Sequence, residues 1–407
     1  MKCDAAVIGG GAAGMLCAAT AAQRGRSVVL LEGQKSCGRK LGITGKGRCN
    51  VTNNCLAREF LQNVPVNAKF LYSAINRFPP GAAMELFESL GVPLKTERGN
   101  RVFPVSDSAR DVVRALEKYA RDSGVRILHL PAGGIRAENG AVRSVLTGSG
   151  EIDCARAVVC TGGLSYPLTG STGDGFRFAR RLGHRVTPAR ASLVPLVSPD
   201  EACARMQGFS LKNVTLTVYD GENREVFREL GEMMFTHFGV TGPLALSASA
   251  HMRDFERGRY RLEIDLKPGL DEKNLDARLL RDFEKNRNRD FANALDGLAA
   301  KSMIPVLIQR SGIPAQTKVN SITRRQRRAL LELFKHFTIE VTGTRPVDEA
   351  IVTSGGVDVR EIDPRTMGSK LVEGLYFAGE VIDVDAYTGG FNLQIAWSTG
   401  YVAGSSV

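Results

Sequence analysis

The sequence predicts an α/β fold in which a doubly wound, Rossmann-like domain is interrupted by an inserted domain. Two glycine-marked segments at opposite ends of the 407-residue chain support this, residues 9–14 (GGGAAG) and residues 379–400 (GEVIDVDAYTGGFNLQIAWSTG). Each follows a short apolar run of the kind that forms a buried parallel strand. From about residue 191 the pattern changes to short β-like runs and then to charged helices. The two ends are therefore predicted to form one domain around the middle of the chain.

The first segment has the order of elements that a dinucleotide site needs. Residues 4–9 (DAAVIG) read as a strand, and Gly9, Gly11 and Gly14 have the G-x-G-x-x-G spacing before a small-residue helix at 15–22. Gly9 allows a tight turn, Gly11 lets the backbone approach a pyrophosphate, and Gly14 lets the helix lie close to the strand. The helix N-terminus would face the phosphates with unpaired N–H groups.

A carboxylate narrows the choice of dinucleotide. The second apolar run, residues 27–31, ends in Glu32, which stands about 20 residues past the glycines and can accept ribose hydroxyls. A carboxylate there disfavours a 2′-phosphate, so FAD or NAD is preferred over NADP. Because the chain has one complete fingerprint, NADH or NADPH would dock only transiently, and molecular oxygen fits equally well as the oxidant.

The remaining elements follow in order. A Gly-rich polar loop occupies residues 38–53, and residues 157–160 (AVVC) form a strand that runs into a second glycine turn at 161–163. Helical periodicity is found at 79–90 and 108–123, and strands are expected near 125–130 and 141–146. The predicted FAD-binding domain is discontinuous, covering 1–190 and 343–407. The insert covers 191–342, with β-rich parts at 191–267 and 337–342 and a helical subdomain at about 268–336.

The C-terminal segment is expected to complete the site. Residues 374–379 (GLYFAG) form a strand, and Gly389 and Gly390 open a final helix through 393–402. In this arrangement Glu380 could accept a hydrogen bond from the ribityl chain of FAD. The helix N-terminus would face the flavin pyrimidine and favour the negative charge of reduced flavin by about 0.3 to 2 kcal/mol.

Composition excludes several classes of protein. Hydrophobic residues make up 43% and charged residues 24%, which is ordinary for a globular protein. Residues 5–23 are uncharged, but the nucleotide motif explains them, so neither a signal peptide nor a membrane span is expected. The eight cysteines have no C-x-x-C spacing, which argues against a metal site or a flavin disulfide reductase and for reduced thiols in the cytoplasm.

The net charge of +11 leaves an alternative open. Arginine is densest at 324–328, directly before residues 329–334 (ALLELF), and this pattern is typical of an amphipathic helix with a solvated basic face. We therefore rank nucleic-acid binding below a solvated surface. A flavoprotein that binds or modifies RNA stays as an alternative function, as does a flavin-binding interaction protein without turnover.

Four long runs resemble a known family. Residues 38–53, 165–184 (SYPLTGSTGDGFRFARRLGH), 233–243 (MMFTHFGVTGP) and 353–400 resemble, in order, the signatures of the BaiN-like flavoproteins, also called aminoacetone oxidase-like FAD-binding enzymes. The resemblance covers nearly the whole chain. It implies a glutathione reductase-like FAD domain with a β-barrel-like insert, and FAD as the cofactor.

The resemblance also implies site residues. The pyrophosphate would be held by Gly9, Gly11, Ala13 and Gly14, the adenosine ribose by Glu32, and the adenine would lie beside the backbone near Gly133. The residues that would lie along the cofactor or complete its site are Arg39, Lys40, Arg48, Asn50, Thr161, Gly162, Gly379, Glu380, Gly390, Asn392 and Leu393.

Catalytic side chains are less well defined by sequence. His237 lies in a Gly-flanked turn of the insert, while Tyr166 and Tyr387 flank cofactor turns, and each has an equally simple role in packing or in a turn. We expect a cytoplasmic FAD-dependent oxidoreductase that transfers a hydride between flavin and a small organic substrate bound between the two domains. Family members are associated with oxidation of amino ketones and with reduction of unsaturated steroid-like acids, and the sequence does not choose between them. No metal site is expected, and the oligomeric state is not predicted.

Overall fold

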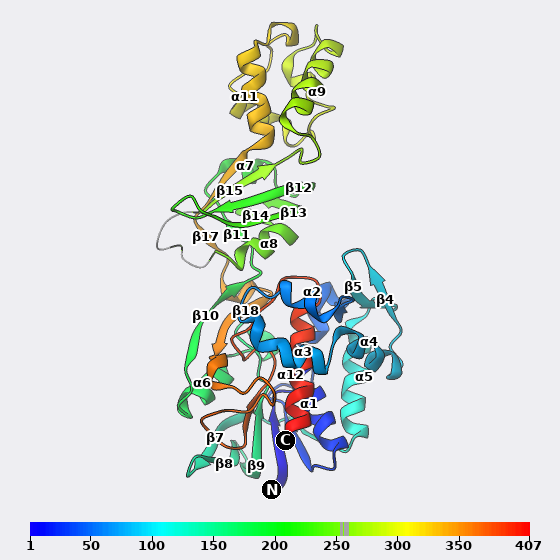
Figure 1. Ribbon diagram of the computed structural model, residues 1–407, viewed down its shortest axis with the longest axis vertical. Coiled ribbons are helices and arrows are strands. Elements are labelled where there is room, and N and C mark those ends of the chain that lie inside the picture. Colours follow the sequence, from blue (N-terminus) through cyan, green and yellow to red (C-terminus); the bar gives the residue numbers. More distant parts are fainter. Residues whose placement is uncertain (253–254, 256–259) are drawn as a thin grey trace. The chain divides into compact units, whose positions relative to one another are not determined.

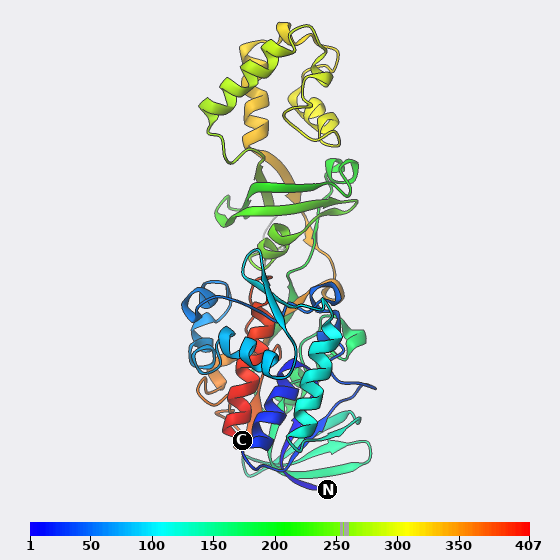
Figure 2. The ribbon, with the colours of Figure 1, turned by 90° about the vertical axis from the view of Figure 1, so that its right-hand side faces the viewer.

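The computed structural model describes residues 1–252, 255 and 260–407. The chain forms two compact units, each with its own hydrophobic core. The first unit comprises Met1–Ser192 and Pro346–Val407, and the second comprises Leu193–Arg345. The first unit is thus built from both ends of the chain, and the second is inserted between them (Figures 1 and 2).

The first unit is organised by a seven-stranded sheet with the strand order β6-β2-β1-β9-β8-β7, to which β19 adds beside β9. Strands β1, β2, β6, β9 and β19 pair in parallel, whereas β7 and β8 form antiparallel pairs. The strands are β1 (Lys2–Ile8), β2 (Val28–Leu31), β6 (Arg126–Leu128), β7 (Ala132–Glu138), β8 (Ala141–Thr147), β9 (Gly150–Val159) and β19 (Leu375–Phe377).

The register of this sheet joins the two ends of the chain. Ile8 of β1 pairs with Val159 of β9, and Val159 in turn pairs with Phe377 of β19. The three parallel strands therefore end at the same level. The segments that follow them, beginning at Gly9, Cys160 and Ala378, emerge together at the carboxyl edge of the sheet.

Two helices from opposite ends of the sequence pack against each other beside this sheet. These are α1 (Ala12–Gln23) and α12 (Phe391–Ser406), drawn in blue and red in Figures 1 and 2. A Cβ on Gly400 would lie 2.5 Å from the carbonyl oxygen of Ala13, and one on Gly404 would lie 2.4 Å from that of Cys17. The two backbones can approach this closely because α12 has glycine on its α1-facing side.

Smaller elements complete the first unit. A three-stranded antiparallel sheet is formed by β3 (Thr52–Asn53), β5 (Arg101–Pro104) and β4 (Leu94–Glu97), and β10 (Val186–Ser192) pairs with β18 (Val352–Val357). The helices here are α2 (Ala57–Gln62), α3 (Tyr72–Arg77), α4 (Pro80–Ser89), α5 (Ala109–Asp122) and α6 (Asp174–Arg181). Short 3₁₀ turns include η1 (Leu41–Gly47), η3 (Pro167–Thr169) and η7 (Val359–Glu361).

The second unit contains an antiparallel sheet that closes on itself. Its strand order is β16-β15-β12-β13-β14-β11-β17, with β16 and β17 at the two ends. Only Thr342 separates these two strands, so one extended segment pairs with both ends of the sheet and closes it like a barrel. The strands are β11 (Leu196–Val197), β12 (Ser210–Tyr219), β13 (Glu225–Thr236), β14 (Gly239–Thr241), β15 (Tyr260–Asp265), β16 (Phe337–Val341) and β17 (Gly343–Thr344).

A helical part is inserted between β15 and β16 of the second unit. It holds α9 (Glu272–Lys285), α10 (Ile304–Ser311) and α11 (Arg324–Lys335), while α7 (Glu201–Arg205) and α8 (Pro243–Ser249) belong to the barrel-like part. Within the basic run 324–328, Arg327 pairs with Asp276 and Arg328 with Glu272, so two of its arginines join α11 to α9. In the described part of the chain, no helix has the length and apolar character needed to cross a membrane.

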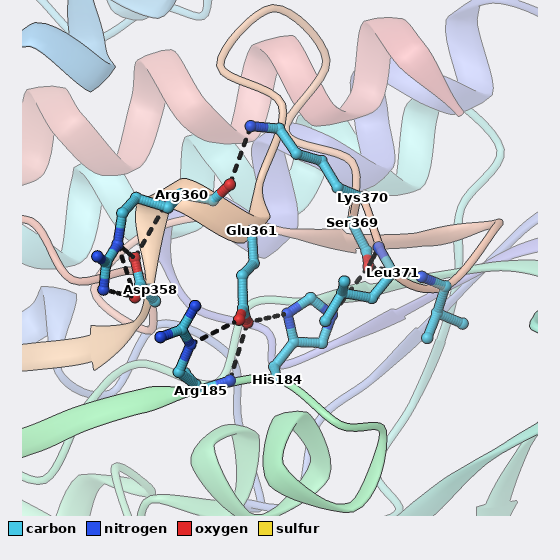
Figure 3. Close-up of polar contacts among 9 residues, drawn as sticks. His184, Arg185, Asp358, Arg360, Glu361, Ser369, Lys370 and Leu371 are labelled. Carbon is cyan, nitrogen blue, oxygen red and sulfur yellow. Dashed lines mark hydrogen bonds and ion pairs between the residues drawn. The ribbon is translucent and has the colours of Figure 1, made fainter.

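A buried histidine links α6 to the C-terminal part of the first unit (Figure 3). Nε2 of His184 lies 2.8 Å from Oγ of Ser369, and Nδ1 lies 3.3 Å from Oε2 of Glu361, which also accepts from the backbone N–H of Arg185. Burial lowers the pKa of His184 more than the Glu361 carboxylate raises it. The imidazole is therefore neutral at pH 7, with Nδ1–H toward the carboxylate and Nε2 accepting from the serine.

Lowering the pH should destabilise the protein through His184. Because its folded pKa is depressed, the unfolded chain binds a proton near the ordinary histidine pKa of about 6.5 while the folded protein does not. The contribution of the neutral His184 to the free energy of unfolding is therefore complete above that pH. It is lost as the pH falls, by up to about 1.4 kcal/mol for each unit by which folding depresses the pKa. Urea unfolding between about pH 7.5 and about pH 5.5 measures it, and His184→Gln should flatten the curve. A variant with the wild-type pH dependence would contradict this role.

Candidate cofactor site

The glycine turn that follows β1, residues 9–14, is packed too closely for side chains at two of its glycines. Gly9 has a φ of +105°, and a Cβ there would lie 2.5 Å from the carbonyl oxygen of Cys160. A Cβ on Gly14 would lie 1.9 Å from the carbonyl oxygen of Gly9. The turn is thus pressed between β9 and the first turn of α1, as the roles of these glycines require.

Gly11 is different, because a Cβ there would have no atom of the described chain within 4 Å. Gly11 is also the N-cap of α1, and the first N–H groups of a helix have no partner inside it. An open space beside the positive end of a helix dipole suits an anionic phosphate. The turn therefore has room for a pyrophosphate beside Gly11, where a side chain would occupy that space.

Glu32 at the end of β2 is held by the same turn. Its carboxylate accepts the N–H of Gly10 at 2.8 Å and the N–H of Gln34 at 2.8 Å. Burial raises the pKa of Glu32, and these two backbone hydrogen bonds oppose the rise. The carboxylate thus fixes both loops at the carboxyl edge of the sheet, next to the helix N-terminus where a nucleotide would lie.

A polar cluster joins the loop after β2 to the C-terminal segment. Nζ of Lys40 lies 2.6 Å from Oε2 of Glu380 and 2.6 Å from Oγ of Ser165, and Ser165 lies 3.1 Å from Oε1 of Glu380. Thr353 contributes its backbone N–H to Glu380 at 2.8 Å and accepts at Oγ1 from the N–H groups of Leu164 and Ser165. The structure thus brings the predicted residues Lys40 and Glu380 into direct contact.

The N-terminus of α12 is held by backbone and side-chain contacts. Gly390 is its N-cap with a φ of +99°, and a Cβ there would lie 2.3 Å from the carbonyl of Thr52. The Asn392 side chain accepts from the N–H of Ala386 and donates to its carbonyl, at 2.9 and 2.7 Å. Leu393 lies half-buried in the first turn, and Thr399 accepts the N–H of Gly379 at 2.9 Å. This helix N-terminus and the turn after β19 are therefore held in fixed register.

Two predicted residues carry buried polar atoms without a partner in the described chain. They are Oδ1 of Asn50, at the end of the Gly-rich loop, and Oγ1 of Thr161, directly after β9. A buried acceptor without a partner is costly, and a bound ligand with donor groups would remove that cost. Together with the open space at Gly11, the orphaned amide oxygen fits an extended polar cofactor such as FAD.

A family model described as HI0933-like protein Rossmann domain matches residues 3–406. The chain belongs to the HI0933-like family. The predicted resemblance, the α/β fold class with its Rossmann-like FAD-binding domain, and the assignment as an FAD-dependent oxidoreductase are confirmed by this match and by the relatives that follow.

Three relatives cover almost the entire HI0933-like chain. It is 33% identical to the ribosomal RNA dihydrouridine synthase of Escherichia coli (strain K12) over 98% of this chain and 96% of the relative. It is 31% identical to the protein of the same name from Haemophilus influenzae, over 98% and 97%. It is 30% identical to the 3-dehydro-bile acid delta(4,6)-reductase of Clostridium scindens, again over 98% and 97%.

Solved structures share the fold at low sequence identity. A flavocytochrome c3 fumarate reductase has a TM-score of 0.53 at 16% identity, covering 100% of this chain and 78% of that chain. A 3-ketosteroid-delta4-(5alpha)-dehydrogenase from Rhodococcus jostii RHA1 has a TM-score of 0.54 at 13% identity, covering 100% and 96%. At such identities they establish the fold of the HI0933-like chain and nothing more specific.

Other predicted residues of this HI0933-like chain are engaged in protein contacts. Arg48 forms ion pairs with Glu97 and Asp107, which raise its pKa, and Arg39 donates to Gln34. The carbonyl of Gly133, in β7, accepts from Arg177 at 3.1 Å. Gly162, in the turn after β9, has a φ of +72°, and Ala13 is buried in α1. Their binding of a cofactor remains a prediction.

The three catalytic candidates occupy different places in the fold. His237 belongs to the second unit, in the turn between β13 and β14, where its ring packs edge-on against Phe238 at 5.0 Å. Tyr166 and Tyr387 belong to the first unit. Tyr166 has a φ of +54° directly before η3, which is strained for a residue with a side chain, and Tyr387 accepts at its carbonyl from Asn392.

Sequence reasoning missed Ser165 and Thr353 as members of the site. Both lie near glycine pairs in runs that carry the family resemblance, but no residue spacing in these runs predicts that the two side chains meet. Ser165 is fully buried although polar, because Lys40 and Glu380 both bond its hydroxyl. Only the folding of four separate segments onto one another identifies the pair.

Proposed function

We propose that this FAD-dependent oxidoreductase is a reductase that adds hydrogen across an electron-poor carbon–carbon double bond. The observation that carries the cofactor part of the proposal is the open space at Gly11, at the carboxyl edge of a sheet to which both ends of the chain contribute. When bound, FAD supplies hydride transfer through its own ring system. The names of the relatives support reduction, since dihydrouridine is a uridine whose ring double bond has been saturated.

We infer the following roles for this chain's residues. The turn at 9–14 and the N-terminus of α1 hold the pyrophosphate, and Glu32 accepts from the adenosine ribose. Glu380 and Lys40 orient the ribityl group that links the phosphates to the flavin ring. The side-chain oxygen of Asn50, which has no partner in the described chain, accepts a hydrogen bond from the cofactor. The N-terminus of α12, behind Gly390, stabilises negative charge on the reduced flavin.

For the substrate we propose a uracil ring in ribosomal RNA. The sequence alone favours a small molecule over RNA, but two relatives named as ribosomal RNA dihydrouridine synthases, at 33% and 31% identity over 98% of the chain, are the reason to propose RNA first. The charge of +11 suits a polyanionic substrate. A uracil that gains a hydride at C6 and a proton from solvent at C5 becomes dihydrouracil. NADH or NADPH, docking transiently, would restore the reduced cofactor by giving up one hydride, which is two electrons and a proton.

A small unsaturated ring compound is the second candidate substrate. The relative named as a bile-acid reductase favours it, at 30% identity over the same share of the chain. In both candidates the double bond is conjugated with a carbonyl group, so the same delivery of hydride serves either. The two differ in whether the substrate carries phosphates.

The holoprotein should convert uridine to dihydrouridine in unmodified ribosomal RNA transcribed in vitro from the genes of the source organism. The reaction contains NADH or NADPH, and the RNA is then digested to nucleosides for mass spectrometry. The expected product is heavier than uridine by two hydrogen atoms. RNA that stays unmodified while an unsaturated 3-oxo steroid acid is reduced would favour the second candidate. Failure of both NADH and NADPH to bleach the flavin would contradict the reductase itself.

A further inference from the structure

A cavity of 310 Å³ lies within the second unit, apart from the residues assigned to FAD. Its walls come from the start of β12, the residues directly after β15, the loop before α10 and the last turn of α11. It therefore sits where the barrel-like part of this unit meets its helical part. None of the functional roles assigned above uses this cavity.

One part of the cavity wall, which we call its floor, is formed by the apolar and aromatic side chains of Phe209, Leu211, Met303 and Phe334, in a lining that also includes polar residues. Leu211, Met303 and Phe334 are buried there, and Phe209 is half-buried beside them. The ring of Phe209 stacks on Phe235, with 6.4 Å between centroids and 6° between planes. Such a surface suits a flat, weakly polar group, and a nucleobase has a π-face that packs well on aromatic side chains.

Two lysines line the same cavity. Lys212 is exposed and Lys267 is half-buried, and within the described ranges neither ammonium has a hydrogen bond or ion pair. Burial and the positive charge of Arg278 lower the pKa of Lys267. The carboxylate of Asp296 also lines the cavity and is exposed. A partly buried cation without a counter-ion gains more from an anionic ligand than a solvated surface lysine does.

A bulge in β12 places one of these lysines. Leu211 pairs with Met233 and Val214 with Gly231, so β12 has one residue more than β13 over this stretch. The extra residue falls at Lys212–Asn213, where Asn213 has a φ of +53°. Bulges re-aim side chains that a regular strand would turn to the other face, and here Leu211 and Lys212 both line the cavity although they are consecutive.

We propose that this cavity binds an unpaired segment of the RNA substrate, with a base against the floor at Phe209 and phosphates at Lys212 and Lys267. This rests on the proposed function, because it takes ribosomal RNA as the substrate. The net charge of +11 gives the complementarity that a polyanion needs. Stacking of bases on aromatic side chains together with phosphate contacts is the usual physics of single-strand binding. The second unit is thereby assigned a role in holding the substrate.

The test measures RNA binding rather than turnover. Wild-type holoprotein, Lys212→Gln, Lys267→Gln and the double variant are titrated into a fluorescein-labelled oligouridylate of about 12 nucleotides, and anisotropy is followed at several salt concentrations. Lys273→Gln, on the exposed face of α9 and outside the cavity, is the matched control. Bleaching of the flavin by NADH or NADPH is recorded for each protein, to verify that the cofactor site is intact.

We expect the double variant to bind about tenfold more weakly, since two phosphate contacts are lost. The slope of log affinity against log salt should fall by about 1.4, because each contact to single-stranded nucleic acid contributes about 0.7. The control should bind as the wild type does, and all variants should keep flavin bleaching. Equal binding by wild type and double variant would overturn the assignment of the cavity alone. Absence of binding by the wild type at low salt would overturn RNA as the substrate and the cavity assignment together.

Discussion

A Gly11→Ala variant should fold as the wild type does and lose most of its affinity for FAD. The new Cβ would enter a space where no described atom lies within 4 Å, and the φ of Gly11, −84°, is one that alanine adopts readily. The apoprotein is therefore not strained. The methyl group would instead stand where the pyrophosphate approaches the helix N-terminus. We expect a loss of at least about tenfold in affinity, which corresponds to about 1.4 kcal/mol.

The measurement is FAD binding to the apoprotein, followed by flavin fluorescence, together with thermal unfolding of the apoprotein. Gly81→Ala is the matched control, because its Cβ would also meet no described atom within 4 Å but lies in α4, away from the turn. It should leave both quantities unchanged or raise stability slightly. Gly14→Ala should do the opposite of Gly11→Ala and destabilise the apoprotein, since its Cβ would lie 1.9 Å from a carbonyl oxygen. If the Gly11→Ala protein retains full affinity for FAD, the assignment of this turn to the cofactor site is wrong.

Gly400→Val should destabilise the protein and release FAD together. The new side chain would meet the backbone of Ala13, already 2.5 Å from an added Cβ, and would force α12 away from α1. Overpacking of this kind costs about 1 to 3 kcal/mol, and a valine against backbone falls at the upper end. Because α1 begins at the turn proposed to hold the pyrophosphate, and the N-terminus of α12 is proposed to face the flavin, separating the two helices also disturbs both halves of the proposed site.

Urea unfolding of the apoprotein and the ratio of FAD to protein after purification measure the two effects. Ser406→Ala, on the same helix, is the control, because it removes only a bond from Ser406 to the carbonyl of Val402. It should keep the wild-type FAD content. If Gly400→Val is destabilised but binds FAD as tightly as the wild type, the two helix ends act independently in cofactor binding.

The first βαβ unit could be predicted from local sequence because each of its requirements is local. The apolar run before Gly9 becomes β1, the glycine spacing becomes the turn, and Glu32 follows β2 as expected. Strand periodicity and glycine geometry act over a few residues, so sequence spacing carries them. The start of α11 is also marked by local sequence, because Thr323 and Gln326 form a capping box at the N-terminus of this amphipathic helix.

The polar cluster around Glu380 could not be predicted in this way. Its members Lys40, Ser165, Thr353 and Glu380 come from four separate segments, and nothing in their own neighbourhoods states which of the others they meet. The contacts of Asn392 could not be predicted either. Its side chain, in the first turn of α12, forms hydrogen bonds with the backbone of Ala386, which lies before that helix. Such contacts depend on the path of the whole chain.

The amino-acid order by itself therefore determined the strand–glycine–helix units, the acid at the end of β2 and the existence of an insertion. The tertiary structure decided which of these strand–glycine–helix segments meet at the carboxyl edge of the same sheet. It did so through the pairing of Ile8, Val159 and Phe377 across three parallel strands and through the glycine contact between α1 and α12. The physical reason is that hydrogen bonding and steric fit between segments hundreds of residues apart depend on their positions in space, which local propensity does not encode.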